Sequence, residues 1–522
     1  MLLALLAMLV IAAALRWTWP AQVADLRPRP DALEYEEAAR NLAAGRGYLL
    51  WIANRAYPPR YPPGMSALIA ASIPIFGGER GVGIWVVLAS ALASIMATFA
   101  LARRAAGASA GLVAALLLTV SPLHVLASEY VMSDVPATAV VALIGLGVVV
   151  LLDGRGSSLG CVALGILCGL AVVLRQPLAL VSFGAWLAVG LLGEGTVGER
   201  MRRLALVAAG GVVGVAPLLW INWQLFGSPL RSGYGYWSPH AGFRLDHGIA
   251  IPASGKPSNL TMYLRTLVGD GWFYPVTASP LLVLGCVAAF RLGGAARRLC
   301  VLTWLATLPL TAFLIVYALR SNRLLLPVLP LIVATMSLCC ASAAPRWMRR
   351  SGLVLVVLTF VWTLGPGRDL LALPFAQSTG DVAALRRLAQ LTEPDAVILA
   401  HSEPFGFAQL LRDGADRRWV PLRSDEHQLA IGLGKLEPVA VDAAEPAWLE
   451  PPIGAGIGRT RLLTRVAALC ATGRPVYLSA QRAGGVPFFG KIEGWLRARW
   501  TLTEVAGSEP WLYRIECDTE RD

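Results

Sequence analysis

Long apolar stretches alternate with short polar segments through the first 365 residues of the chain. Many of these stretches approach the roughly 20 residues that an α-helix needs to cross a bilayer. The pattern predicts a polytopic α-helical membrane protein with about eleven transmembrane helices. We place them at residues 2–19, 81–101, 109–127, 133–152, 158–174, 177–193, 204–226, 277–292, 299–318, 323–343 and 351–365.

Two apolar stretches near the N-terminus need separate interpretation. Met65–Phe76 is too short to span, so we expect an interfacial or re-entrant helix inside the first loop. Met1–Leu15 lacks the basic start of a signal peptide and has no evident small-residue cleavage site after it. A retained first helix is therefore favoured over a cleaved leader.

The distribution of arginine supports this arrangement of spans. With the N-terminus inside, the inside turns carry most of the basic residues, as is the rule for membrane proteins. These turns hold Arg103, Arg104, Arg155, Arg200, Arg202, Arg203, Arg291, Arg297, Arg298, Arg346, Arg349 and Arg350. The loop 20–80, the loop 227–276 and the tail then face outside. If residues 65–76 also spanned, every later turn would change sides and the pattern would fail.

The tail has a different character from the rest of the chain. Strand-like runs alternate with helical patterns, as at Asp381–Leu391, Ala396–Ala400, Val466–Cys470 and Pro475–Leu478. We therefore predict a transmembrane domain at residues 1–365 and a soluble extracytoplasmic α/β domain at residues 366–522.

Composition narrows the class further. The chain is 56% hydrophobic and 15% charged, whereas a soluble protein carries about a quarter charged residues. The net charge of +12 lies in the membrane part, because the tail is close to balanced. Topology explains most of this excess, so no nucleic-acid partner is expected.

Cysteine and glycine positions indicate packing rather than chemistry. Six of the eight cysteines lie in or beside apolar segments, where they are expected to be buried small hydrophobes. Cys470 and Cys517 lie in the tail and could pair there, which spacing alone does not decide. Small-residue spacing in Gly165–Gly169 and Gly210–Gly214 predicts close helix packing.

The first outside loop contains an acidic helix. Asp31 follows Pro30, and Asp31, Tyr35 and Ala38 share one helix face at three-to-four spacing. Asp31 could be an N-cap, which an acid stabilises in any case, or a carboxylate held at the membrane surface for chemistry. The neighbouring acids could form a solvated face: Glu34, Glu36 and Glu37.

A second acidic segment, Ser128–Pro136, falls at an outside turn and contains Glu129 and Asp134. Asp134 could simply cap the next helix, which has Pro136 in its first turn. However, charged groups at membrane depth are costly and tend to be functional. Asp31 and Asp134 lie on the same side of the membrane in this topology.

Arginines and aromatic residues share this side. The arginines are Arg60, Arg175, Arg320 and Arg323. Their planar guanidinium groups suit phosphate oxygens, but snorkelling to the membrane surface is an alternative interpretation. The aromatic segment Phe226–Trp237 includes Tyr234 and Tyr236. It could form an interfacial belt or stack on a sugar, and the sequence leaves both open.

Taken in order, these motifs resemble those of the GT-C glycosyltransferases. The resemblance is to the bacterial relatives of protein O-mannosyltransferase and of the lipid A aminoarabinose transferase (family 39, the Rgt-like group). The matching motifs lie within residues 1–345: Asp31-x-x-x-Tyr35-x-x-x-Ala38 with Gly45-x-Gly47, Pro62-Pro63-Gly64, Met132-Ser133-Asp134-x-Pro136, Leu174-Arg175-x-Pro177, Phe226-Gly227-Ser228-Pro229 with Gly233-Tyr234, and Arg320-x-x-Arg323-x-x-x-Pro327-x-x-Pro330. The chain departs from the family at Ala32, where a second acid or a serine is frequent, and at Arg60, where some relatives have a lysine.

The resemblance implies a GT-C-like fold and the transfer of a sugar from a polyprenyl-phosphate donor to an acceptor hydroxyl. The acceptor would be a glycan, a lipid or a protein at the outer face of the bacterial cytoplasmic membrane. Asp31 would be the general base, and Asp134 would orient a substrate or help to bind a divalent cation such as Mg or Mn. The four arginines would bind the donor phosphate. Further substrate contacts are expected from Tyr35, Glu129, Tyr234 and Tyr236.

Two other classes compete with this interpretation. A transporter or flippase of a lipid or small anion would also carry charges in the membrane, but neither inverted repeats nor mid-span acids are visible. A non-catalytic scaffold would use the tail to bind a cell-wall partner. The position of the charges separates the classes: a transporter has them at the midplane, whereas an enzyme of this kind gathers them around one cavity at the outer rim.

Overall fold

The chain forms two compact units in a computed structural model. The helical unit comprises Met1–Ala24, Tyr61–Ser232 and Pro239–Pro374, and the second unit comprises Asp25–Arg60, Gly233–Ser238 and Phe375–Asp522. The structure describes residues 2–17, 30–52, 55–77, 81–155, 157–237, 245–249, 257–269, 278–317, 321–365, 387–400, 417–422, 440–441, 458–479, 487–507 and 512–519. Arg320 and residues 381–386 of a predicted helix lie outside these ranges.

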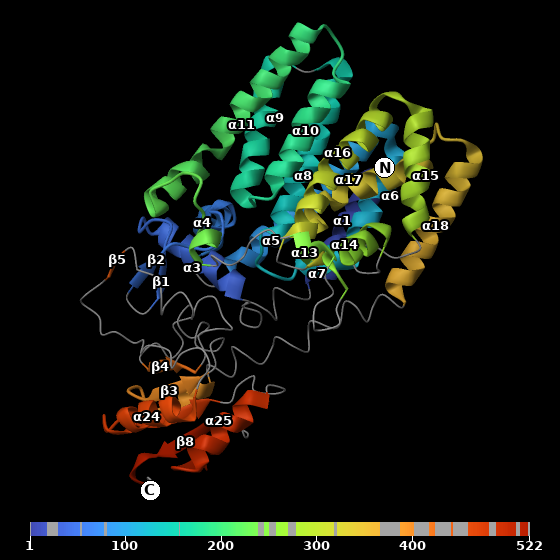
Figure 1. The fold of residues 1–522 in the computed structure, drawn as a ribbon. Helices are drawn as coiled ribbons and strands as arrows, with labels where there is room; N and C mark the ends of the chain where they lie inside the picture. Colours follow the sequence, from blue (N-terminus) through green and yellow to red (C-terminus); the bar gives the residue numbers. More distant parts are fainter. Residues whose placement is uncertain are drawn as a thin grey trace. The chain divides into compact units, whose positions relative to one another are not determined.

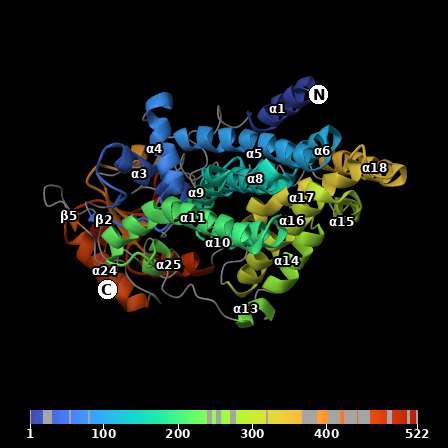
Figure 2. The ribbon, with the colours of Figure 1, turned by 90° about the horizontal axis from the view of Figure 1, so that it is seen from above.

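The helical unit is a bundle whose helices follow the predicted spans (Figure 1). Its elements are α1 (Leu2–Trp17), α4 (Gly64–Phe76), α5 (Val82–Ala106), α6 (Ala108–Thr119), α7 (Pro122–Ala127), α8 (Asp134–Val150), η1 (Leu151–Arg155), α9 (Ser158–Leu174), α10 (Leu178–Leu192), α11 (Val197–Phe226), α13 (Leu245–Ile249), α14 (Asn259–Val268), α15 (Ser279–Leu292), α16 (Gly294–Val316), η3 (Asn322–Val328), α17 (Leu329–Met336), η4 (Ser337–Cys340) and α18 (Arg346–Leu364). Every predicted span coincides with a helix or a run of helices. Seen from above, α5 lies beside α8, with α16 and α17 following (Figure 2).

Five helices within the described residues are long and apolar enough to cross a membrane by themselves. They are Val82–Ala106, Asp134–Gly154, Val197–Phe226, Gly294–Val316 and Asn322–Cys340. Six further apolar helices are 10–17 residues long, and Gly64–Phe76, the segment predicted not to span, is one of them. The prediction of a multi-pass helical membrane protein is confirmed, and the count of eleven crossings stays a prediction.

Proline explains where a predicted span is broken. The span 109–127 is two helices, because the chain leaves helical geometry at Ser121 and Pro122 occupies the first turn of α7. Proline has no backbone N–H and is favoured at that position. The span 323–343 likewise changes from η3 to α17 around Pro327 and Pro330, and α17 continues into η4 without a further proline.

Glycine seams bring helices of this unit into backbone contact. A Cβ at Gly165 would lie 2.1 Å from Val207 O, and one at Gly214 would lie 2.3 Å from Ile166 O. The α9 and α11 backbones therefore touch, as the glycine spacing predicts. In the same way, a Cβ at Gly64 would lie 2.7 Å from Val173 O. The glycine of Pro62-Pro63-Gly64 is thus needed for α4 to reach the end of α9.

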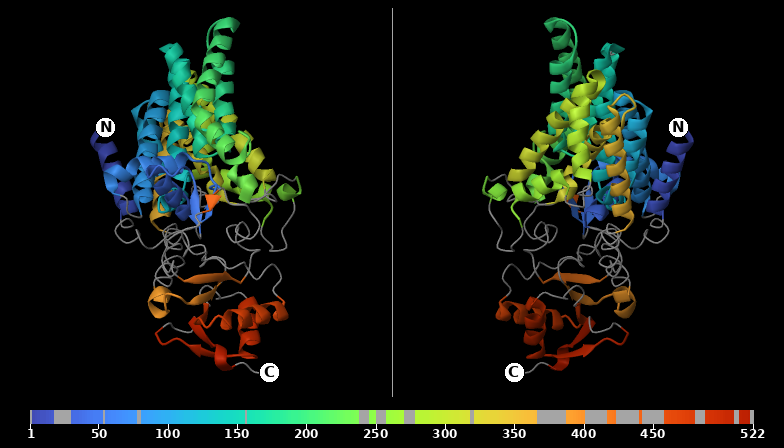
Figure 3. Two further views of the ribbon diagram at one scale, coloured as in Figure 1. Left: turned by 90° about the vertical axis from the view of Figure 1, so that its left-hand side faces the viewer. Right: turned by 90° about the vertical axis from the view of Figure 1, so that its right-hand side faces the viewer.

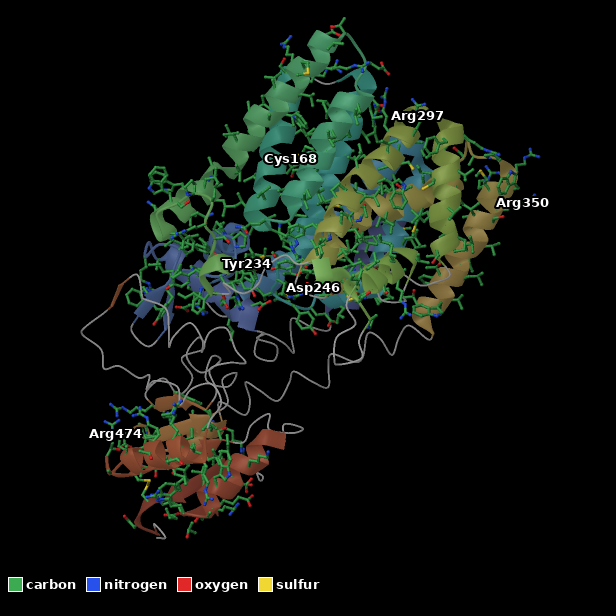
Figure 4. All side chains as sticks on the ribbon, viewed as in Figure 1. Cys168, Tyr234, Asp246, Arg297, Arg350 and Arg474 are labelled. Atoms are coloured by element: carbon green, nitrogen blue, oxygen red, sulfur yellow. A yellow bond between two sulfur atoms is a disulfide. The ribbon has the colours of Figure 1, made fainter. Side chains whose placement is uncertain are left out.

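Ion pairs gather the arginine-rich turns at one end of the helical unit. Arg104 Nη2 lies 2.6 Å from Asp153 Oδ2, and Arg298 Nη1 lies 3.1 Å from Asp153 Oδ1. Arg298 also pairs with Glu194. Arg297 and Arg350 lie toward this end, whereas Asp246 lies toward the other (Figure 4). The predicted grouping of these turns is therefore correct.

The second unit joins part of the first loop to the tail. It contains α3 (Pro30–Ala43), β1 (Leu50–Ile52), β2 (Arg55–Tyr57) and α12 (Gly233–Trp237). In the tail lie β3 (Val397–Ala400), β4 (Arg418–Pro421), β5 (Ala440–Val441), α24 (Arg459–Cys470), β6 (Val476–Ser479), α25 (Pro487–Arg497), β7 (Thr501–Glu504), β8 (Leu512–Glu516) and η5 (Cys517–Thr519). The antiparallel sheet β1-β2-β5 links the loop and the tail, since Arg55 pairs with Val441 and Ala56 with Ala440.

The tail has its own sheet, in the order β4-β3-β6-β8-β7. β3 is parallel to β4 and β6, while β8 is antiparallel to β6 and β7. Figure 3 shows these strands with α24 and α25 in orange and red. Apolar side chains of sheet and helices form one core, among them Leu399, Leu462, Leu478 and Trp500. The predicted α/β character is confirmed, and a disulfide joins Cys470 to Cys517.

Candidate functional site

The acidic helix of the first loop begins where the sequence predicts. α3 starts at Pro30 and carries Asp31 in its first turn, where an acid is favourable. The following acids do not face solvent, because Glu34, Glu36 and Glu37 are all buried. The interpretation of these three residues as a solvated face is therefore wrong. Glu37 is neutralised on its own helix by Arg40 and hydrogen-bonded to Asn41.

Two carboxylates of α3 meet one guanidinium. Arg60 Nη2 donates a short hydrogen bond to Glu34 Oε1 and lies 3.6 Å from Asp31 Oδ1. Asp31 has a side chain that is 20% exposed, compared with 10% for Arg60 and 2% for Glu34. Asp31 is thus the member of this cluster that a substrate can reach.

Burial makes Glu34 an unusual acid. It raises the pKa of Glu34 from 4.5 to about 7; the Arg60 cation limits the rise and the Asp31 charge adds to it. Within the described residues the second carboxylate oxygen of Glu34, Oε2, is buried and has no hydrogen-bond partner. The carboxyl group therefore exchanges its proton close to neutral pH.

The short helix α12 fixes the backbone that carries Arg60. A Cβ at Gly233 would lie 2.1 Å from Pro59 O and 2.6 Å from Arg60 O, so only glycine fits there. Trp237 Nε1 donates a 2.7 Å hydrogen bond to Pro58 O, and its ring lies 5.9 Å from that of Tyr57. The helix Gly233–Trp237 thus supports the backbone segment that carries Arg60.

The tyrosines predicted to contact the substrate differ in how deeply they are buried. Tyr35 is buried, while Tyr234 and Tyr236 are half-buried. The Tyr236 ring packs edge-on against Trp237 at 5.8 Å. Tyr234 and Tyr236 therefore keep surface for a ligand, and their substrate-binding role stays a prediction, as does that of Tyr35.

In the helical unit, Asp134 is ion-paired with Arg175. Asp134 is the first residue of α8, and Arg175 ends α9. These helix ends lie opposite the turns that hold Asp153 and the arginine network, because both helices run between the two ends of the bundle. The Asp134 side chain is 3% exposed and that of Arg175 is 11% exposed. The sequence named both residues but not their pairing.

Glu129 and Arg323 complete the predicted set in this unit. Arg323 Nη1 lies 2.6 Å from Met132 Sδ, two residues before Asp134. Glu129 is buried in the same segment. The structure thus gathers Glu129, Asp134, Arg175 and Arg323 at one end of the helical unit, and Asp31, Tyr35, Arg60, Tyr234 and Tyr236 in the second unit. The expectation that both sets line one outward cavity stays a prediction, as does the role of Arg320.

Sequence reasoning did not find the buried arginine of α1. Arg16 donates hydrogen bonds to Ser128 Oγ at 3.2 Å and to Thr119 O at 3.3 Å. Its Nη2 also lies 2.8 Å from His124 Nδ1, and His124 Nε2 lies 3.0 Å from Ser94 Oγ. His124 therefore has structural partners and anchors the segment before Glu129. The position of Arg16 next to the end of an apolar helix was the feature of the sequence that could have indicated it.

The predicted cation site does not fit the residues described. Among them, no group of three or more His, Cys, Asp and Glu side chains could hold a metal ion. Asp134, the expected ligand, is occupied by Arg175. A divalent cation stays a prediction, and we assign it no step.

Comparison with known proteins shows which family and which solved structures the chain is similar to. Residues 60–223 match the family of dolichyl-phosphate-mannose-protein mannosyltransferases. The chain is similar in structure to ArnT from Cupriavidus metallidurans in the apo state, with 14% identity and a TM-score of 0.61 over 99% of this chain and 99% of that chain. The same protein bound to undecaprenyl phosphate gives 14% identity and a TM-score of 0.60 over 98% of this chain and 97% of that chain.

A more distant likeness is to the oligosaccharyltransferase of Archaeoglobus fulgidus in complex with Zn and sulfate. It shows 14% identity and a TM-score of 0.51, over 80% of this chain and 62% of that chain. No curated protein matches the sequence. The structural likeness establishes the GT-C fold, and the family match covers Arg60, Asp134 and Arg175. The prediction of a membrane protein with this fold is confirmed, and the family match supports a glycosyltransferase activity.

Proposed function

We propose that this protein transfers a sugar from a polyprenyl-phosphate donor to an acceptor hydroxyl at the outer face of the bacterial cytoplasmic membrane. One observation carries the proposal: the fold matches, over nearly its whole length, that of ArnT solved with undecaprenyl phosphate bound. The family match to mannosyltransferases named for dolichyl-phosphate-mannose supports the same donor class.

Asp31 acts as the general base. The acceptor oxygen attacks the anomeric carbon of the donor, its proton passes to the Asp31 carboxylate, and the bond from that carbon to the phosphate oxygen breaks. A hydroxyl is a poor nucleophile until a positioned carboxylate takes its proton, and such help is typically worth about 10²–10⁴-fold in rate. Asp31 is the accessible acid of its cluster, which suits this role.

The leaving polyprenyl phosphate needs positive charge near its oxygens. Arg175 and Arg323 are arginines of the helical unit at the end that carries Asp134. Guanidinium groups held in place before the reaction stabilise the charge that develops as the phosphate leaves. In this proposal Asp134 holds Arg175 in position until the donor arrives, and the acceptor is a glycan, a lipid or a protein.

The charge positions favour an enzyme over a transporter. Asp134 opens α8 and Arg175 closes α9, so this pair lies at helix ends and not at their midpoints. Transport pathways place such groups near the bilayer midplane. In this proposal the Asp134–Arg175 pair meets the headgroup of the lipid-linked donor at these helix ends.

The tail disulfide supports an extracytoplasmic tail. Cys470 and Cys517 are joined across 47 residues, and such bonds persist in oxidising compartments such as the bacterial periplasm. In intact cells, a membrane-impermeant thiol reagent should label the tail only after mild reduction. Labelling without reduction, or only after cell lysis, would place the tail elsewhere.

The function is tested by incubating membranes that contain the protein with a panel of radiolabelled polyprenyl-phosphate sugars. We expect label to move from one donor into an acceptor fraction, and the Asp31→Asn variant to leave the label on the donor. Absence of transfer from every donor in the panel would refute the proposal. Identification of the labelled product then names the acceptor.

A further inference from the structure

Two acids on α3 compete for Arg60. Its Nη2 is hydrogen-bonded to Glu34 Oε1, whereas its 3.6 Å separation from Asp31 Oδ1 exceeds an ordinary hydrogen bond. Asp31 and Glu34 are three residues apart and therefore lie on the same side of the helix. Glu34 holds the cation, and Asp31 is its looser partner.

This division matters for a base. A carboxylate that pairs tightly with a guanidinium favours its charged form and takes up a proton less readily. Glu34 is buried and cannot meet a substrate, whereas Asp31 is accessible. The acid that a substrate can reach is thus the one that lies beyond hydrogen-bond distance of Arg60.

The short helix α12 holds the backbone that carries Arg60. Gly233 packs against the carbonyl groups of Pro59 and Arg60, and Trp237 is hydrogen-bonded to Pro58. The side chain alone can exchange partners. Another element that packs on α3 is β1, Leu50–Ile52, which carries no charge. Among the described residues, the charges that act on Glu34 are those of Arg60 and Asp31.

We propose that Glu34 is a positioning residue for the base: by holding Arg60, it keeps this cation beyond hydrogen-bond distance of the Asp31 carboxylate, which accepts the acceptor's proton. This inference rests on the proposed function, because it assigns a partner to the base of that reaction.

A pH response follows from the titration of Glu34. Its pKa is raised to about 7, chiefly by burial, so it takes up a proton as the pH falls through neutrality. Neutral Glu34 no longer holds Arg60 by charge, and Arg60 closes on Asp31. In the wild-type protein, kcat should therefore rise as the pH increases from about 6 to about 8.

The test replaces Glu34 by glutamine in the full-length protein. Glu34→Gln fixes the neutral form, so at about pH 8 we expect kcat to fall about tenfold, the KM for the donor to stay unchanged, and the rise between pH 6 and 8 to disappear. The matched control is Glu37→Gln on the same helix, whose partners are Arg40 and Asn41. It should keep the wild-type pH profile.

Each result bears on the inference. A Glu34→Gln protein with wild-type kcat overturns it, and so does a lowered kcat that still rises between pH 6 and 8, since that indicates a merely structural role. If Glu34→Gln fails to fold, Glu34→Asp is tested instead, because aspartate keeps a titrating acid at this position. A reduced kcat that still rises between pH 6 and 8 would then support the inference. A wild-type kcat in Glu34→Asp would overturn it. Wild-type protein without any transfer refutes the proposed function itself, whereas an inactive Asp31→Asn with an unaffected Glu34→Gln refutes only this inference.

Discussion

Two sites in this molecule set carboxylates against arginine, but in different proportions. On α3, Asp31 and Glu34 share Arg60, whereas between α8 and α9 a single acid, Asp134, pairs with Arg175. The first cluster keeps a net negative charge when both acids are ionised, and the second is neutral. In the proposed function, the Asp31 carboxylate of the first cluster accepts a proton, while Asp134 holds Arg175 in place.

The two sites also differ in the solvent exposure of their aspartate side chains. Asp31 is 20% exposed and Asp134 is 3% exposed. Withdrawal of an ion pair from water is costly unless the partners stay together, so the pair at α8 is sensitive to the loss of either member. Replacement of Asp31 should therefore affect the rate, and replacement of Asp134 the stability.

The largest expected effect is on the rate. Asp31→Asn removes the base while preserving shape, so kcat for sugar transfer should fall by about 10²–10⁴-fold. Expression and membrane insertion should remain near normal. A radiolabelled donor assay measures the rate, with Glu37→Gln as control. A fully active Asp31→Asn protein would show that Asp31 is not the base, and the proposed difference between the two sites would be wrong.

Stability should respond most at the other site. Asp134→Ala leaves the Arg175 charge buried without its partner, which should lower the free energy of unfolding by about 3–5 kcal/mol. Thermal unfolding in detergent measures this, and Asp31→Ala should change the midpoint far less. The double variant Asp134→Leu/Arg175→Met removes both charges and should recover most of the loss. Failure to recover would mean that the pair does more than balance charge.

A pH dependence of stability distinguishes Glu34 from Asp31 and Asp134, the other acids of these two sites. Because its folded pKa is about 7 against an ordinary 4.5, the folded state binds the proton more tightly, and its contribution to stability is complete below about pH 4.5. That contribution, roughly 3 kcal/mol, is lost as the pH rises through 7. Glu34→Gln lacks this titration, so the wild-type protein should lose stability relative to the variant between pH 5 and 8. Parallel unfolding curves for the two proteins across this range would contradict it.

The smallest expected effect is on donor affinity. Arg323→Ala removes one guanidinium near Met132 and should raise the KM for the donor about tenfold, about 1.4 kcal/mol, with kcat less affected. Arg320→Ala should act in the same direction. Arg297→Ala, toward the arginine-rich end, is the control and should leave the KM unchanged. Equal effects at Arg323 and Arg297 would remove the phosphate-binding assignment.

The fold was largely predictable, because a bilayer imposes strong rules on a sequence. Apolar length and arginine position predicted the spans and which turns group together, and Asp153 with Arg104 and Arg298 bears this out. The division at Pro122 was missed, since hydropathy averages over a window and ignores a single missing N–H.

The site was predictable in its residues but not in their partners. Helix periodicity could not show that Glu34 is buried, because burial depends on chain segments distant in sequence. Arg60 follows Glu34 by 26 residues, and no local pattern indicates that they pair. The disulfide between Cys470 and Cys517 was likewise open, since closure across 47 residues depends on how β8 and α24 meet.

The glycine seam between α9 and α11 has a mechanical consequence. Where main chain rests on main chain, as at Gly165 and Gly214, there are few side-chain atoms to rearrange. We therefore expect α9 and α11 to move together as one rigid element. Arg175, at the end of α9, should move with them. If the proposed donor is correct, we expect an opening for its isoprenoid chain to form between neighbouring helices, while α9 and α11 keep their contact and Arg175 keeps its place.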